Sequence, residues 1–525
     1  MFKFDKSQNK LNLTNSNIQR EMATSGRINR RKFLGSAAAA SLAFTVVPRN
    51  VLGGPGYVAP NDKLVIGYIG CGTQGMREMT QLIANPAIQI AAVCDPNKFT
   101  TDYVDWSLNG IRDSIRRALE DKTWGEKFKG IPGGRDIGQE FVNRYYAKTK
   151  GAGTYKGCTS YADFRELLEK ENDIDAIKIM TPDHLHATVA IASMKKGKHV
   201  VTHKPIANRI SEGKLTIETA RKTGLSTHLL AWSRRPGYDI IKNWIKGGFI
   251  GTLKEIHNWS NRPVWPQWQS IPTDRPPVPK GFDWQLWLGP VPDRPYHPNF
   301  THAVFRGWYD FGGGSIADMG HYSLFPLFLT LGINTPAVSA EAYATTTCTI
   351  KDNVAVGVVN DAAFPLSCII RFQFQAQAEL PPFDLIWYDG GIRPLVPDEL
   401  RASGKTLTRE GMMFVGDKGK ILAGFRGENP VLLPESKMNY IKTEEEKEDQ
   451  GASTTEVWIE AFRNKTQPPG SFLYAGPVTE TINLGAVALR AGRKVEYDSA
   501  NMKITNLPEA NKFLTREYRA GWELS

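Results

Sequence analysis

The chain has 525 residues, 41% of them hydrophobic and 10% aromatic, which is an ordinary composition for a folded protein of two or three domains. Its formal charge of +11 first suggests a nucleic acid or an anionic membrane as partner. Residues 1–62, however, hold nine basic and three acidic side chains, so only +5 falls on the other 463 residues, and this distribution argues against nucleic-acid binding.

Residues 1–62 are expected to be a targeting segment followed by a linker. Paired arginines, Arg30 and Arg31, precede a mildly apolar, alanine-rich run over residues 34–47. The run is too short and too weakly apolar for an ordinary membrane span, and the pair resembles a twin-arginine export signal. We therefore expect export in the folded state to the periplasm or elsewhere outside the cytoplasm. No stable membrane span is expected unless the signal stays uncleaved.

An alternation of strands and helices begins after this segment. Residues 63–69 have the pattern of a buried strand and end in a glycine motif that leads into an amphipathic helix. A second strand, residues 88–94, stops at Asp95, 20 residues after the last glycine of the motif. The motif consists of Gly70, Cys71, Gly72, Thr73, Gln74 and Gly75.

The motif and the terminal acid together predict a dinucleotide site. Gly70 permits the tight turn, Gly72 lets the backbone approach a pyrophosphate, and Gly75 allows close packing of helix on strand. Asp95 stands where an acid bonds the adenosine ribose. Because an acid repels a 2′-phosphate, NAD is favoured over NADP, although the nearby Lys98 keeps NADP possible.

The alternation continues with a helix at residues 161–170, a strand at 175–180, a helix at 188–196 and a strand at 199–202. Strands that alternate with helices predict a parallel sheet covered on both faces. The fold class is therefore α/β, with an N-terminal Rossmann dinucleotide-binding domain over residues 63–231.

Chemically active side chains follow two of these strands, at the edge of the sheet where ligands bind. Lys204, held between His203 and Pro205, is out of place as a solubility charge, and a structural ion pair is its alternative role. His184 and His186 could suggest a pair of metal ligands, but no cysteine or carboxylate cluster has the spacing of companion ligands, so a metal site is disfavoured. We expect cofactor contacts from the lysine and from the residues after the first of these strands, namely Thr181, Pro182, His184 and His186.

Residues 232–525 have a different character and are expected to form a second domain for substrate binding and oligomerisation. Pro and Trp crowd residues 258–308, three glycines precede a helix that runs to about residue 331, and strand-like segments continue to residue 427, with a hairpin turn at 416–419. A helix follows at 477–492. This order predicts an α+β domain with a large, mostly antiparallel open sheet. The acidic run at 444–449 is expected to be a solvated loop.

Five cysteines, without any CxxC or other metal-ligand spacing, predict free and packed thiols instead of a disulfide framework or a zinc site. They are Cys71, Cys94, Cys158, Cys348 and Cys368.

Four motifs in this order and spacing resemble the Gfo/Idh/MocA family, named for glucose-fructose oxidoreductase, inositol dehydrogenase and rhizopine catabolism. The motifs are the glycine motif, residues 181–186, residues 203–205 and the pentapeptide at 318–322. The resemblance implies a Rossmann domain before an open-sheet domain, a nicotinamide cofactor, and sugar, polyol or glycoside substrates. It also implies a homodimer or homotetramer that forms through the exposed sheet face.

The sequence departs from the family pattern at two positions. Most members have a glutamate before the lysine, where this chain has His203, and a histidine four residues after the aspartate, where it has Tyr322. The glucose-fructose oxidoreductase branch is similar to this chain in having tyrosine there.

Oxidising a carbinol carbon removes a hydride and a proton, so a base is needed within about 3 Å of the hydroxyl. Desolvation and the positive nicotinamide ring favour a neutral Lys204 amine, which makes Lys204 with Tyr322 the first choice. His321, which titrates nearer neutrality, is the rival partner of the lysine, and a purely structural role for both remains the third possibility. Asp318 would orient one of them or the sugar.

Aromatic faces suit pyranose rings and arginines suit sugar hydroxyls, so Arg262, Trp265 and Arg306 are the expected substrate contacts. The sequence as a whole predicts an NAD(P)-dependent oxidoreductase that holds its cofactor tightly and acts on a sugar, polyol or glycoside. The alternative is an NAD-dependent glycosidase or lyase that oxidises the sugar transiently to permit elimination.

Overall fold

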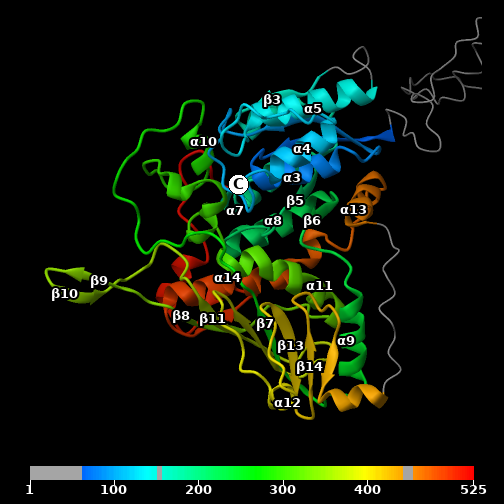
Figure 1. The fold of residues 1–525 in the computed structure, drawn as a ribbon, viewed down its shortest axis with the longest axis vertical. Coiled ribbons are helices and arrows are strands. Elements are labelled where there is room, and N and C mark those ends of the chain that lie inside the picture. The colour runs from blue at the N-terminus through cyan, green and yellow to red at the C-terminus, as the bar shows by residue number, and fades with distance from the viewer. Residues whose placement is uncertain (1–61, 151–156, 441–452, 525) are drawn as a thin grey trace, which may run out of the picture.

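The computed structural model describes residues 62–150, 157–440 and 453–524. The predicted export signal and the acidic run at 444–449 lie outside these residues. Figure 1 shows two layered parts, a smaller sheet with its helices at the top and a larger sheet at the bottom, with a layer of helices between them.

Within the described residues, the first sheet contains six parallel strands in the order β3-β2-β1-β4-β5-β6. This is the doubly wound order of a dinucleotide-binding domain. Its strands are β1 (Leu64–Ile69), β2 (Ile88–Cys94), β3 (Thr159–Tyr161), β4 (Ala176–Ile179), β5 (His199–Thr202) and β6 (Thr227–Leu229). Its helices are α3 (Thr73–Leu82), α4 (Gly110–Leu119), α5 (Arg135–Lys150), α6 (Phe164–Lys170), α7 (Asp183–Lys195) and α8 (Ile210–Thr223).

One helix of this domain begins earlier than the sequence predicts. Helix α7 starts at Asp183, directly after Pro182, whereas the apolar pattern suggested a start at residue 188. All but two of its 13 residues are buried, so the helix has no polar stripe that would reveal its beginning.

The large sheet confirms the predicted second architecture. Over the described ranges it has nine strands in the order β15-β14-β13-β7-β12-β11-β8-β16-β17, and the pair of β7 with β12 is parallel whereas the other pairs are antiparallel. The predicted turn at 416–419 joins β13 to β14. The strands are β7 (Leu253–Trp259), β8 (Ser339–Ala344), β11 (Cys368–Phe374), β12 (Phe383–Tyr388), β13 (Gly411–Gly416), β14 (Lys420–Ala423), β15 (Val431–Leu433), β16 (Val495–Asp498) and β17 (Lys503–Ile504).

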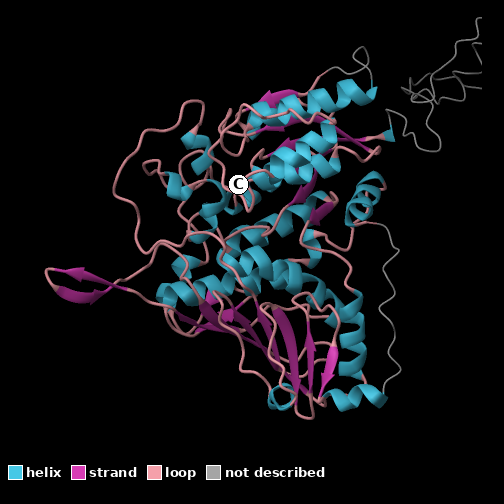
Figure 2. Ribbon diagram, viewed as in Figure 1, coloured by secondary structure: helices cyan, strands magenta, loops and turns pink. Residues whose placement is uncertain are grey.

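A two-stranded hairpin, β9 (Cys348–Lys351) and β10 (Val354–Gly357), leaves the end of β8 and projects from the body of the molecule, at the left of Figure 2. We call residues 345–359 the arm. Its strand residues are exposed on both faces, with Ile350 70% and Val354 58% exposed.

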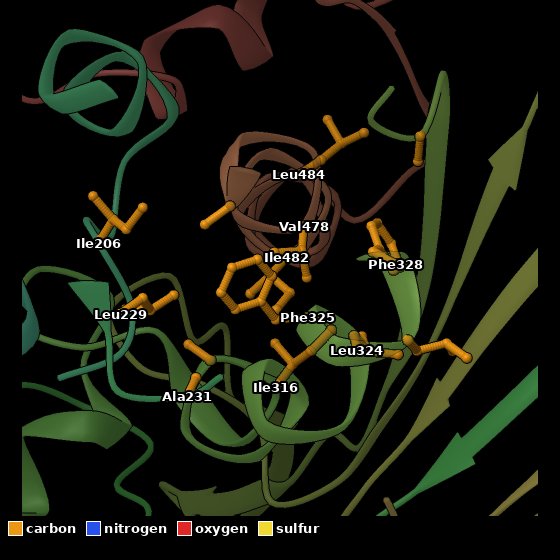
Figure 3. Close-up of a cluster of buried hydrophobic side chains, with 14 of the residues drawn as sticks. Ile206, Leu229, Ala231, Ile316, Leu324, Phe325, Phe328, Val478, Ile482 and Leu484 are labelled. Atoms are coloured by element: carbon orange, nitrogen blue, oxygen red, sulfur yellow. The ribbon is translucent and has the colours of Figure 1, made fainter. Parts of the chain in front are cut away.

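Helices α11 (His321–Leu331) and α14 (Gly476–Ala491) lie between the two sheets, and α9 (Pro236–Lys246) packs on α11 beside the large sheet. Helix α14 packs on β8 and β11 on one side and on α8 on the other. Figure 3 shows Phe325 of α11 directed at Val478 and Ile482 of α14, next to Ile316. This apolar cluster fixes the start of α11, where the predicted proton carriers lie.

Helix α13 (Thr454–Arg463) crosses the predicted domain boundary. It lies in the range assigned to the second domain, yet Trp458 and Phe462 pack into the core of the first domain, and the helix contacts β1. The first domain therefore needs a segment more than 200 residues beyond its predicted end.

All five cysteines are free thiols, four of them buried and Cys348 exposed. In the described part of the chain, no three His, Cys, Asp or Glu side chains gather in a way that could hold a metal ion. Among the same residues, none of the helices combines the length and the apolar character that crossing a bilayer requires.

Candidate active site

The glycine motif closes a tight turn between β1 and α3. Gly70 has a φ of +103°, and a Cβ on Gly75 would lie 2.1 Å from the Gly70 carbonyl oxygen, so a side chain at either position is unfavourable. A Cβ on Gly72 would lie 3.1 Å from the Tyr103 ring. The turn leaves the N-terminus of α3 facing a cavity of about 1430 Å³, including its mouth, and the motif residues Gly70, Gly72, Thr73, Gln74 and Gly75 line it.

Asp95 follows β2 and lines the same cavity. Its carboxylate accepts hydrogen bonds from the backbone N–H of Cys71 at 2.7 Å and of Asn97 at 2.8 Å. Burial raises the pKa of Asp95 to about 6, and these two N–H donors limit the increase. A carboxylate at this end of the glycine turn suits the ribose of a dinucleotide.

The two residues after β4, Thr181 and Pro182, line the cavity, but the two histidines beyond them do not. His184 bonds the carbonyl oxygens of Phe311 and Trp287, and His186 bonds those of Pro205 and Thr181. The expectation that they contact the cofactor is therefore corrected. Because α7 begins at Asp183, both rings lie in its first turn and point into protein, where they hold neighbouring loops.

Lys204, after β5, reaches the second domain. Its Nζ donates to Asp318 Oδ1 at 2.8 Å across the cavity, and only 3% of the lysine surface is exposed. This contact joins two residues 114 positions apart, so the lysine and the 318–322 segment can touch one small molecule.

Asp318 is the anionic centre of the site. Besides Lys204, it has Arg306 Nε 3.5 Å from Oδ1 and Arg262 Nε 3.5 Å from Oδ2. Burial alone raises the pKa of Asp318, but the charges of Lys204 and Arg306 outweigh it and lower the pKa to about 2. The carboxylate is therefore ionised at any pH at which the protein is expected to work.

Tyr322 and His321 face different surroundings. The Tyr322 ring lines the cavity, its hydroxyl is 2.8 Å from His203 Nε2, and Lys204 Nζ is 4.9 Å from the ring centre. His321 does not line the cavity and is fully buried; its Nδ1 is 3.0 Å from the Ala317 carbonyl oxygen. Burial lowers the pKa of His321 to about 4, so the ring is neutral.

The expected substrate residues separate into two groups. Arg262 and Arg306 line the cavity, whereas Trp265 is buried and lines a different hollow together with Pro263 and Arg393. The chain from residue 261 to 265 runs between the two hollows, so Arg262 faces one and Trp265 the other. The expectation that Trp265 contacts substrate is corrected for this reason.

Arg426 and Trp106 are among the cavity residues that the sequence reasoning missed. Arg426, in the turn after β14, has its guanidinium 4.9 Å from the Tyr322 ring centre. Trp106, between β2 and α4, lies 5.8 Å from the Arg262 guanidinium. No local motif marks either residue, because each reaches the site only through the packing of distant segments.

Two family models match the chain. The model described as "Oxidoreductase family, NAD-binding Rossmann fold" matches residues 139–229, and the one described as "Oxidoreductase family, C-terminal alpha/beta domain" matches residues 246–360 and 399–524. Both belong to the Gfo/Idh/MocA group, and together they cover more than half of the chain.

Curated relatives are similar over shorter stretches. Levoglucosan dehydrogenase of Pseudarthrobacter phenanthrenivorans is 32% identical over 111 residues, which are 20% of this chain and 28% of that one. Glycosyl hydrolase family 109 protein 1 of a Shewanella species is 28% identical over 242 residues, which are 43% and 44% of the two chains. The chain thus spans less than half the length of these relatives.

Solved structures of similar overall fold include the WlbA dehydrogenase of Bordetella pertussis in complex with NADH and UDP-GlcNAcA. It is 15% identical with a TM-score of 0.47, over 83% of this chain and 99% of that one. A levoglucosan dehydrogenase in complex with NADH and L-sorbose is 14% identical with a TM-score of 0.47 at the same coverage.

Proposed function

Because this chain belongs to the Gfo/Idh/MocA oxidoreductase family, we propose that it transfers a hydride between NAD and a CH–OH carbon of a sugar, polyol or glycoside. The observation that carries the proposal is one shared cavity. It has the glycine turn and Asp95 at one end and Lys204, Asp318 and Tyr322 at the other. A dinucleotide and a small hydroxylated molecule can meet there.

The residues at the first end fit NAD. The glycine turn excludes side chains where a pyrophosphate would approach, and Asp95 suits the ribose hydroxyls. When bound, NAD supplies the hydride acceptor. The acid favours NAD over NADP, which the same cavity could accept less readily.

The residues at the second end are suited to hold and move the hydroxyl proton. We infer that the Tyr322 hydroxyl and the Lys204 Nζ contact the reacting hydroxyl. In oxidation the Tyr322 oxygen takes the hydroxyl proton while the phenol proton passes to His203 Nε2, and in reduction both transfers run the other way. His203 Nε2 lies 2.8 Å from the Tyr322 hydroxyl, and Asp318 fixes the Lys204 ammonium through the 2.8 Å ion pair. His321 is the less suitable carrier, since its ring lies outside the cavity lining.

Two substitutions test this assignment in single-turnover reduction of the bound cofactor. We expect Tyr322→Phe to slow reduction by about a hundredfold or more, the range of a lost acid–base group, and His321→Gln to change it less than about threefold. Tyr388→Phe is the matched control, since Tyr388 also bonds a histidine, His257, at 2.9 Å but lies on the large sheet. The reverse order of effects would assign the proton to His321, and unchanged rates in both would remove this segment from the chemistry.

We further propose that the protein is exported folded, with NAD already bound. The support is the arginine pair before the alanine-rich run, together with a site that a folded chain must complete from both domains. Cell fractionation of an Arg30→Lys, Arg31→Lys double variant should find it retained in the cytoplasm. Mass spectrometry of small molecules released on denaturing the purified protein should recover NAD, and an empty protein would argue against tight retention.

We also propose a homodimer or homotetramer that forms through the outer face of the large sheet. That face carries polar and charged side chains on β7, β11 and β12, among them the ion pair of Arg371 with Asp384. In the proposed oligomer, the same face of a second copy covers this face of the sheet.

A second function is the NAD-dependent glycosidase or lyase. The specific observation in its favour is the similarity to the family 109 glycosyl hydrolase over 242 residues. Tyr322, with His203 beside it to take the phenol proton, would also remove a proton beside a transient ketone. Net cleavage of a glycoside without net NADH would favour this reaction, whereas stoichiometric NADH with an intact glycoside would favour the dehydrogenase.

A further inference from the structure

The substrate end of the cavity holds more positive than negative charge. Four cationic side chains line it, namely Lys204, Arg262, Arg306 and Arg426. The lining acid at this end is Asp318, and the second acid of the lining, Asp95, lies at the glycine turn. The buried Asp183 adds one charge from behind, through a 3.1 Å contact with Arg306 Nη1.

These cations are not placed for the cofactor phosphates. The pyrophosphate site is the N-terminus of α3, within the first domain. The three arginines come from the second domain and are within reach of the 318–322 segment: Arg262 and Arg306 are each 3.5 Å from Asp318, and Arg426 is 4.9 Å from the Tyr322 ring centre. They therefore surround the position of the reacting sugar.

The anionic partners in the protein are already shared. One carboxylate, that of Asp318, serves Lys204, Arg306 and Arg262 at once. Arg262 Nε is buried without a hydrogen-bond acceptor among the described residues. Across residues 62–150, 157–440 and 453–524, no carboxylate stands within ion-pair distance of the Arg426 guanidinium, and Glu428 instead accepts from the backbone N–H of Arg426.

Partly buried guanidinium groups without a full set of acceptors are costly unless a ligand supplies them. A guanidinium presents paired N–H donors that match the geometry of a carboxylate or sulfate. A neutral sugar would offer hydroxyls, which satisfy hydrogen bonds but leave the charge uncompensated. The excess of charge is therefore matched by an anionic ligand.

We propose that the carbohydrate bound in this cavity carries an acidic substituent, a carboxylate or a sulfate, and that Arg426 and Arg262 bind it. The inference rests on the proposed function only in that a carbohydrate occupies the cavity. Arg426 is then a specificity-determining residue. The two arginines hold the sugar at its acidic group, and the Asp318–Lys204 pair holds it from the other side.

The test compares matched glycosides on the full-length protein with its own cofactor. The probes are methyl β-D-glucuronide, methyl α-D-galacturonide and the 6-sulfate of methyl β-D-glucoside, each with its neutral methyl glycoside. Binding is measured by calorimetry and cofactor reduction by absorbance. At least one acidic probe should bind about tenfold to hundredfold more tightly than its neutral counterpart, the range of a charge-assisted hydrogen bond, and salt should weaken the preference. The carboxylate and sulfate probes distinguish the two acidic groups.

Arg426→Gln should reduce the preference of acidic over neutral probe by about tenfold, and Arg426→Lys should keep part of it. The control is Arg401→Gln, at an exposed position on α12 (Asp398–Ala402), and it should keep the whole preference.

Equal binding of acidic and neutral members in every pair, or a preference that survives Arg426→Gln, would overturn the inference. Neutral glycosides that reduce the cofactor without preference would leave the proposed function standing. Preferential binding of an acidic probe without any cofactor reduction would contradict the proposed function and support this inference.

Discussion

At the scale of the residue, the choice between His321 and Tyr322 depends on one local irregularity. Residues Ile316–Gly320 form a π-helical turn before α11. Each helical residue advances about 100° around the axis, so one extra residue in a turn changes which side chain faces the cavity. Asp318 and Tyr322 face it, and His321 points into the core. In a regular α-helix, Asp318 would stand beside both His321 and Tyr322, three and four residues further on.

We expect His203 to support Tyr322 as a neutral partner. Burial, together with the charge of the adjacent Lys204, keeps the pKa of His203 well below its usual range, so the ring is uncharged at neutral pH. His203→Ala should slow single-turnover cofactor reduction by about tenfold, less than Tyr322→Phe. Because the ring is already neutral, the substitution should leave the pH dependence of the rate unchanged around pH 6.5, the ordinary pKa of histidine. His257→Ala removes the histidine–tyrosine bond to Tyr388 and serves as the control. A His203→Ala profile that loses an acid limb would show that the ring is charged.

The pKa of Asp318 gives a stability prediction with a definite sign. Its folded-state pKa of about 2 lies below the usual 3.8, so the stabilisation is present above about pH 4 and is lost as the pH falls through about 2. Asp318→Asn should lower the free energy of unfolding by about 2–3 kcal/mol at pH 7, a difference that narrows below pH 4. Urea denaturation at several pH values measures it, with the exposed Asp398→Asn as control. Equal urea midpoints at pH 7 would contradict the prediction.

At the scale of the element, the strand-to-helix turn after β1 is defined by what it excludes. A Cβ on Gly75 would lie 2.1 Å from a backbone oxygen that cannot rotate away, so α3 must shift from β1 if a side chain is added. Helix α7 shows the opposite case. Its first turn carries His184 and His186 inward, where they bond four backbone carbonyl groups, three of them on distant segments, instead of a ligand.

Gly75→Ala should therefore lower both stability and cofactor retention. We expect a loss of about 1–3 kcal/mol, the usual cost of overpacking, and a smaller fraction of protein purified with NAD. Gly357→Ala on β10, where an added Cβ meets nothing within 4 Å, is the matched control. Thermal unfolding and the absorbance of released nucleotide measure the two effects. Full NAD content in Gly75→Ala would show that the turn tolerates a side chain.

At the scale of the whole molecule, the two domains are interleaved. Helix α13 completes the first core, and the C-terminal tail returns to the first domain, where Tyr518 bonds Glu212 of α8 at 3.0 Å and Arg165 of α6 lies 4.5 Å from the Trp522 ring. A fragment that ends near residue 231 would lack α13 and the C-terminal tail, and therefore all of these contacts. The cavity is thus held by segments from both halves of the sequence.

The arm provides a prediction about assembly. A two-stranded hairpin is marginally stable alone, and Ile350 and Val354 expose apolar surface on it. If a second copy covers the arm together with the open sheet, the double change Ile350→Asp, Val354→Asp should shift the oligomer towards smaller species in light scattering coupled to size-exclusion chromatography. Ile271→Asp, at a comparably exposed apolar residue on a separate loop, is the control. An unchanged mass for the arm variant would exclude the arm from the interface.

The sequence by itself determined the parts that depend on local spacing. The strand, the glycine turn, Asp95 at the end of the next strand and Lys204 at the carboxyl edge follow from periodicity and from residue types that few other positions tolerate. The large sheet was also predictable in kind, because its strands alternate with turns. These features need only neighbours in the chain to specify them.

Only the tertiary structure decided which side chains share the cavity. Arg426 and Trp106 join it, and Trp265 and the two histidines of α7 leave it. Tyr322, the first choice from the sequence, lines the cavity, whereas its rival His321 does not. Each of these outcomes depends on the phase of a helical turn or on contacts between segments about 100 or more residues apart. Packing fixes such contacts after the elements have formed, so no local pattern in the sequence records them.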